Sequence, residues 1–139
     1  MPNHTGCIGG GSLKEQLHVH EIIQPTSETA TFTPDGTDRR HYNSILFVIQ
    51  CDETSGTGTF TPSIAHGTVA ATLVACSTAE LGNSDTPTAI SADGMQVIYA
   101  DCRNMSRYVG LIMTAASSPT MTIGIIAVMG AQTEYLPTA

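Results

Sequence analysis

SILFVIQC, at residues 44–51, is the stretch of sequence that decides the fold class. Its β-branched and aromatic residues favour a strand, in which successive side chains point to opposite faces. Both faces of this strand would be apolar, with Ile45, Phe47 and Ile49 on one and Leu46 and Val48 on the other. A sandwich strand normally alternates apolar with polar residues. The pattern therefore indicates that the outer face is covered, either by a loop of the same chain or by another subunit.

MTIGIIAV, at residues 121–128, is also apolar on both faces, since Ile123 and Ile125 would oppose Ile126 and Val128. Outward from these two stretches, short apolar runs separated by turn residues recur about every ten residues, as in a sandwich or barrel. The other runs are HVHEIIQ (18–24), ATFT (30–33), GTFTPSI (58–64), VAATLVAC (69–76), MQVIYAD (95–101) and RYVGLIMT (107–114). We therefore predict an all-β chain, with a single β-sandwich domain over residues 17–139 and a Gly-rich extended N-terminal arm over residues 1–16.

Two segments allow more than one secondary structure. Residues 69–79 contain alanines and a leucine that would suit either a strand or one or two helical turns, and this choice stays open. Residues 109–130 are apolar enough to span a bilayer as a helix. A polar turn that contains Pro119 interrupts them in the middle, so we predict a β-hairpin there and no membrane span.

The surface composition favours contact with other proteins. Hydrophobic residues make up 41% of the 139 residues, and charged residues only 12%, about half the usual share. A surface rich in Thr, Ser, Asn and Gly repels neighbouring subunits weakly, although a Thr-rich β-domain facing water would have the same composition. The formal net charge of −7 leaves no basic stripe for phosphates, so we expect neither nucleic-acid nor anionic-membrane binding.

The four cysteines, Cys7, Cys51, Cys76 and Cys102, lie far apart and form no CxxC pair. The first residues contain neither the basic leader nor the apolar stretch of a signal peptide, so we expect reduced thiols formed in a cytoplasm. Zinc held by His18, His20 and a cysteine is the alternative. The lack of paired ligand spacing favours a solvent-facing strand for the two histidines, and we predict no metal site.

Catalytic and cofactor motifs are missing from the sequence. It contains no GxSxG, Walker, HExxH or strand-linked GxGxxG pattern. Asp52 with Glu53, and Asp35 with Asp38, could act as acid pairs, but turn capping and solvation account for both. The absence of tryptophan weakens a sugar-binding role without excluding it. We therefore predict a protein that is not an enzyme, with no catalytic, cofactor-binding or metal-binding residues and no cofactor.

One arrangement of motifs resembles a known family. Gly58, Thr59, Phe60 and Thr61 begin one predicted strand, and Ser106, Arg107, Tyr108 and Val109 begin a later one. This GxFT strand, followed by an RYV-type strand, is similar to small tailed-phage virion proteins encoded near the major capsid protein. The resemblance covers roughly residues 44–130. The sequence departs from the family pattern in a short loop after Thr61 and in Ser106, which replaces a basic residue.

The resemblance implies a jelly-roll-like β-sandwich that serves as a capsid decoration (cement) or minor head protein. Its partners would be the major capsid protein and copies of itself, with a trimer favoured because such cement proteins often sit on three-fold axes. Its location would be the virion, assembled in the host cytoplasm. The alternative is a tail, fibre or carbohydrate-binding module. In this fold we expect Tyr108 to start a core strand with its hydroxyl paired, and Arg107 to pair with Asp101.

Overall fold

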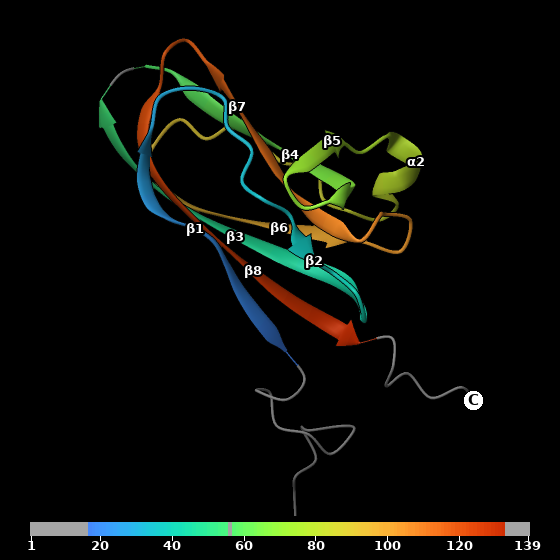
Figure 1. Cartoon of the computed structure of the whole chain (residues 1–139). Helices are drawn as coiled ribbons and strands as arrows, with labels where there is room; N and C mark the ends of the chain where they lie inside the picture. Colours follow the sequence, from blue (N-terminus) through green and yellow to red (C-terminus); the bar gives the residue numbers. More distant parts are fainter. Residues whose placement is uncertain (1–16, 56, 133–139) are drawn as a thin grey trace, which may run out of the picture.

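The computed structural model describes residues 17–55 and 57–132, so the predicted arm over residues 1–16 and the last seven residues lie outside it. Within these residues eight strands and one short helix make up the regular structure (Figure 1). Their bounds are β1 (His18–Glu28), β2 (Thr37–Asp38), β3 (Tyr42–Ser55), β4 (Thr59–Val69), β5 (Thr72–Ala75), α2 (Thr78–Leu81), β6 (Gly94–Asp101), β7 (Tyr108–Ala116) and β8 (Thr120–Gln132).

The strands form two four-stranded antiparallel sheets, which confirms the predicted β-sandwich. One sheet has the order β1-β8-β3-β6 and the other β2-β7-β4-β5. Four of the pairings are nested: β1 pairs with β8, β2 with β7, β3 with β6 and β4 with β5. Such nesting is what one long hairpin would produce if it were rolled up into two facing sheets. With eight strands in two sheets, the topology is that of a jelly roll.

The core lies between the two sheets. Ile45, Phe47 and Ile49 of β3 are fully buried, so the face predicted for these three residues is the inner one. They pack in one cluster with inward residues of β8, such as Ile123, and of the opposite sheet, such as Phe60. Packed sheets lie about 10 Å apart, which apolar side chains from the two inner faces fill.

The undecided segment over residues 69–79 contains both a strand and a helical turn. β5 supplies the strand, and α2 follows it behind a capping box, in which Ser77 Oγ accepts from Glu80 N–H and Glu80 Oε1 accepts from Ser77 N–H. The strand predicted for ATFT (30–33) is wrong. Only Phe32 pairs there, through two backbone bonds to Met113, and beside it the Thr31 hydroxyl rather than a backbone carbonyl accepts from the Ala115 N–H.

The predicted hairpin over residues 109–130 is correct in its two strands and wrong in their pairing. β7 and β8 are joined by a tight turn, in which Ser117 and Ser118 have positive φ angles of 59° and 54°. They belong to different sheets, because β8 is already bonded on both sides by β1 and β3. The turn therefore crosses from one sheet to the other. Within the described residues, no helix is long and apolar enough to cross a membrane.

The two motifs behind the family resemblance have structural roles at opposite ends of the β4–β7 pair. Thr59 pairs with Ala116 at one end, and Gly67 with Tyr108 at the other. Gly58 lies under the β7–β8 turn, where a Cβ atom would be only 2.3 Å from the backbone nitrogen of Pro119. A glycine is required at that position because any side chain would push the turn away.

The ion pairs at the other end of β7 differ from those predicted. Arg107 pairs with Asp38 at 2.9 Å, because β2 places Asp38 opposite Tyr108, and the Arg107 guanidinium lies over the Tyr108 ring. Asp101 pairs instead with Arg103 at 2.7 Å, across the turn that follows β6. Tyr108 does start a strand and is half-buried, but its hydroxyl has no hydrogen-bond partner among the described residues.

The free edge of β6 is covered by the loop that precedes it. The Tyr99 N–H donates to the Asp85 carboxylate at 2.8 Å, and the Asp101 N–H donates to the Ser84 hydroxyl at 2.8 Å. Nearer the start of the strand, the Gln96 side chain bonds both the N–H and the carbonyl of Thr88. The backbone groups of this edge are therefore bonded within the chain at Tyr99 and Asp101, the last part of the strand.

Stability should fall as the pH drops from about 4 towards 2. Hydrogen bonds from Arg107 lower the pKa of Asp38 to about 2, and those from Arg103 hold the pKa of Asp101 well below its usual range. A carboxylate whose pKa is lowered on folding stabilises the protein above its unfolded pKa of about 3.9, and this contribution is lost as the pH falls through the folded pKa. Urea unfolding measured from pH 5 to pH 2.5 should show the decrease.

The variant Asp101→Asn should have a weaker pH dependence over the same range and should be less stable at pH 6 by about 2 kcal/mol, as expected for hydrogen bonds to a charged group. Asp35→Asn is the matched control, since the Asp35 side chain is exposed. An unchanged pH dependence in Asp101→Asn would contradict the role of this ion pair.

Candidate functional site

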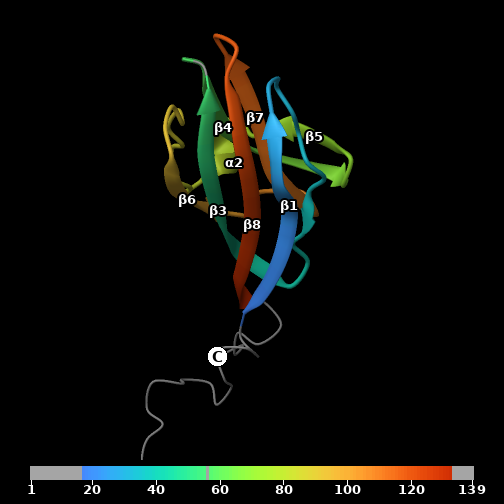
Figure 2. The ribbon, with the colours of Figure 1, turned by 90° about the vertical axis from the view of Figure 1, so that its left-hand side faces the viewer.

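The outer faces of the two sheets differ in chemistry. On the β2-β7-β4-β5 sheet, the outward positions of β4 carry hydroxyls, as at Thr61 and Ser63, and Thr61 pairs with Thr114 of β7. The outward positions of the β1-β8-β3-β6 sheet are mainly apolar, and Figure 2 shows its four strands side by side. We call this surface the apolar face, and its residues are Val19, Leu46, Val48, Met95, Val97, Ile126 and Val128.

The strand register aligns these side chains in rows across the sheet. Val128 of β8 lies opposite Val19 on one side and Leu46 on the other. In the next row, Val48 lies opposite both Ile126 and Val97. Because cross-strand neighbours are about 5 Å apart, the rows form one continuous surface.

Much of the apolar face is open to solvent in the single chain. Met95 is 68% exposed, Val19 60% and Val97 46%. Among the large hydrophobic side chains exposed in the described chain, only Val69 and Val74 lie away from this face. The sequence left open whether a loop of the same chain or another subunit covers this face. No loop within the described residues lies over it, so the face is accessible to another protein.

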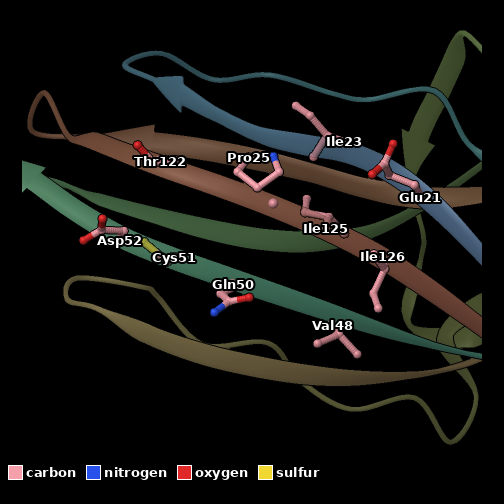
Figure 3. Close-up of a pocket in the computed structure, with 11 residues that line it drawn as sticks. Glu21, Ile23, Pro25, Val48, Gln50, Cys51, Asp52, Thr122, Ile125 and Ile126 are labelled. Atoms are coloured by element: carbon pink, nitrogen blue, oxygen red, sulfur yellow. The ribbon is translucent and has the colours of Figure 1, made fainter.

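A groove of about 430 Å³ lies on the apolar face, and Gly124 of β8 is one of the residues that line it. Figure 3 labels the other lining residues. Pro25 of β1 and Gln50 of β3 flank the groove, and Val48 and Ile126 continue it along the strands. The hollow has two local causes. Gly124 lets the Pro25 ring pack against β8, since a Cβ atom at Gly124 would lie 3.2 Å from Pro25 Cγ, and β1 shifts register between Glu21 and Ile23 and again between Ile23 and Thr26.

Two carboxylates flank the groove, Glu21 on β1 and Asp52 on β3. Both side chains are exposed, and neither has a described ion pair. The described arginines are bonded elsewhere, since Arg103 pairs with Asp101, Arg40 and Arg107 pair with Asp38, and Arg39 donates to the carbonyls of Met105 and Ser106. The negative ends of the groove are therefore not neutralised by the arginines of this chain.

The residues considered as acid pairs or zinc ligands lie as follows in the described part of the chain. His18 and His20 lie on one face of β1, opposite Met129 and Ala127. Asp38 is bonded to Arg40 and Arg107, while Asp35 is exposed. The side chain of Glu53 lies outside the described residues. Within that part of the chain, no three His, Cys, Asp or Glu side chains come together as metal ligands.

The described cysteines lie in environments that suppress thiolate chemistry. Burial raises the pKa of the Cys76 thiol to about 11 and that of the Cys102 thiol to about 12. Cys51 is buried, with its sulfur 3.4 Å from that of Met121. Because the thiolate is the nucleophile, these side chains act as small hydrophobic residues.

Two features of the structure were not predicted from the sequence. His66 of β4 accepts a hydrogen bond at Nδ1 from the Ser106 N–H, and its Nε2 lies 3.1 Å from Glu80, so it ties β4 to the start of β7 and to α2. Nothing in the sequence pairs these positions. The groove does have an indication in the sequence, because a glycine inside a strand pattern often marks a bulge or the close approach of another segment. Gly124, inside β8, is such a glycine.

Comparison with known proteins finds the fold and no close relative. No protein-family model and no curated protein sequence matches the chain. Among solved structures, VP2 of infectious bursal disease virus, solved as a subviral particle, superposes with a TM-score of 0.55 at 9% identity, over 86% of this chain and 33% of that one. The SPBc2 prophage-derived protein YomS superposes with a TM-score of 0.50 at 6% identity, over 83% of this chain and 93% of that one.

The chain thus spans about a third of the length of the viral protein that it matches. At these identities the likeness shows the fold alone. Fold and surface together define the protein as a small jelly-roll β-sandwich with one apolar outer face.

The two faces of β3 should respond differently to substitution. Phe47→Ala removes a fully buried ring and should cost about 3–5 kcal/mol of unfolding free energy. Leu46→Ser, on the adjacent residue, should change it by less than about 1 kcal/mol, because Leu46 is 39% exposed in the single chain. Urea unfolding of a dilute sample gives both values. Equal losses would contradict the assignment of inner and outer faces.

Proposed function

We propose that this protein is a structural component of a virus particle, which binds a capsid shell as a decoration (cement) or minor head protein. The observation that carries the proposal is the apolar face of the β1-β8-β3-β6 sheet. A jelly roll already has a complete core between its sheets, so a second apolar surface adds nothing to the fold of the single chain. Such a surface becomes favourable when another protein covers it.

The fold comparisons support a particle role. VP2 in its subviral particle and the prophage protein YomS have the same fold. The GxFT and RYV motifs add the resemblance to tailed-phage virion proteins. On this proposal the partners are the major capsid protein and copies of the chain itself, with a trimer favoured. The protein acts in the virion after assembly in the host cytoplasm, and it is not an enzyme and binds neither nucleic acid nor membrane.

The mechanism is mechanical. Stable protein interfaces bury roughly 1,200–2,000 Å². Rows of valine, leucine and isoleucine side chains pack well against a second apolar surface, and the low charge content limits repulsion between subunits. Binding across the boundaries between shell subunits adds interface area that must be broken before the shell can expand or dissociate.

The alternative, a tail, fibre or carbohydrate-binding module, would need a groove lined by aromatic rings on which sugars stack. Among the described residues that line the groove on the apolar face, none is aromatic. This composition favours a protein partner.

A charge placed on the apolar face should abolish attachment to the shell. In Val97→Asp the new carboxylate would be buried without a partner in the complex, whereas in the free chain it remains in water, since Val97 is 46% exposed. Val74→Asp is the matched control, because Val74 is 66% exposed on β5 in the other sheet. Sedimentation with shells that lack the protein should show binding by the wild type and by Val74→Asp, and none by Val97→Asp.

Light scattering of the free protein tests self-association, with the mass of a trimer expected. Quantitative mass spectrometry of purified particles should find the chain in a fixed ratio to the major capsid protein. Absence from particles, or retention on a sugar matrix by a monomer that ignores shells, would favour the alternative module.

A further inference from the structure

We propose that the groove on the apolar face binds an extended segment of a partner protein in which one apolar residue stands between two basic ones, in the order basic–x–apolar–x–basic. The inference deepens the proposed function. It rests on one part of that function, namely that another protein covers the apolar face. It assigns the groove a ligand class, a backbone conformation and a spacing of charges.

The spacing follows from the strand register. Glu21 lies opposite Ile126 on β8, and Asp52 lies beside Thr122 of the same strand. These two positions on β8 are four residues apart, which is about 13 Å along an extended chain. In an extended partner segment, residues i, i+2 and i+4 point to one side and the outer two are separated by the same distance. Glu21 and Asp52 also lie on opposite sides of β8, each about 5 Å across the sheet from it, so the long side chain of a Lys or Arg at each outer position is needed to reach its carboxylate.

The hollow between the carboxylates fits the middle residue of such a segment. Gly124 lies midway between the two β8 positions and has no side chain. Pro25 flanks this gap on one side, and Val48 and Ile126 supply apolar surface beside it (Figure 3). An aliphatic side chain placed here would be removed from water on several sides.

Charge decides between a basic partner and a second copy of this chain. The chain has a formal net charge of −7, and its described arginines are already bonded to Asp38, to Asp101 or to backbone carbonyls. A second copy docked face to face would bring its own Glu21 and Asp52 towards the same surface. A segment with Lys or Arg at both ends neutralises the two carboxylates instead, and it follows the groove along the strands.

The test uses full-length protein and short capped peptides, titrated by amide chemical-shift mapping. The first peptide is Thr-Lys-Thr-Leu-Thr-Lys-Thr. The second has the same composition with its lysines adjacent, and the third has Glu in place of Lys. The first should bind most tightly, with the largest shifts at Gly124, Val48 and Ile126, and the Glu peptide should not bind.

Matched variants separate the groove from general attraction to an acidic protein. Glu21→Gln and Asp52→Asn should each weaken binding of the first peptide about two- to five-fold, the range of an exposed ion pair. Asp35→Asn changes the net charge equally at an exposed site outside the groove and should leave the affinity unchanged. Circular dichroism checks that each variant is folded.

Three results would overturn the proposal: no binding of the first peptide at millimolar concentration, equal weakening by Asp35→Asn, or equal affinity for the peptide with adjacent lysines. A dimer that forms through the apolar face and excludes the peptide would assign the groove to a second copy. The titration contains no shell, so its failure is distinct from failure of the proposed function, which the sedimentation of Val97→Asp tests.

Discussion

β3 and β8 pair along almost their whole length, from Tyr42 opposite Gln132 to Ser55 opposite Thr120, and the rest of the structure depends on this pairing. It brings together segments that are far apart in the sequence, and each strand then has one free side, where β6 and β1 add. Since both sides of β8 are occupied, β7 must enter the other sheet, and the turn between them closes one end of the sandwich over Gly58. The inner faces of the two central strands supply much of the core, and their outer faces supply the centre of the apolar face.

Local pattern was sufficient to predict the fold class and most strands, because an alternating backbone decides which residues share a face. It correctly separated Ile45, Phe47 and Ile49 from Leu46 and Val48. It failed where the outcome depends on residues distant in sequence. Phe32 forms only an isolated bridge with Met113 instead of a strand. Arg107 pairs with Asp38 because β2 lies beside β7. The groove requires Gly124 next to a shifted β1, and no single segment encodes that combination.

The outer faces of the two sheets differ in chemistry. One presents hydroxyls to solvent, and the other presents apolar rows with a carboxylate at each end of its groove. Charged residues are scarce, and Arg103 and Arg107 are already paired with carboxylates near the ends of β6 and β7. The difference in polarity between the two outer faces is therefore larger. In the function and ligand class proposed above, the partner supplies both the apolar cover and the positive charge. In that proposal, the two-faced strands and the low charge seen in the sequence together define the chemistry that the partner needs.

The loop that covers the free edge of β6 also limits how copies of the chain can associate. With the Tyr99 and Asp101 N–H groups bonded to Asp85 and Ser84, the last part of that edge has fewer free groups on which a neighbour's strand could continue the sheet. At the opposite edge, Pro25 and two register shifts interrupt β1. Edge-to-edge addition is therefore disfavoured along these parts of the β1-β8-β3-β6 sheet. Contacts through a face can instead close on themselves, which gives assemblies of finite size.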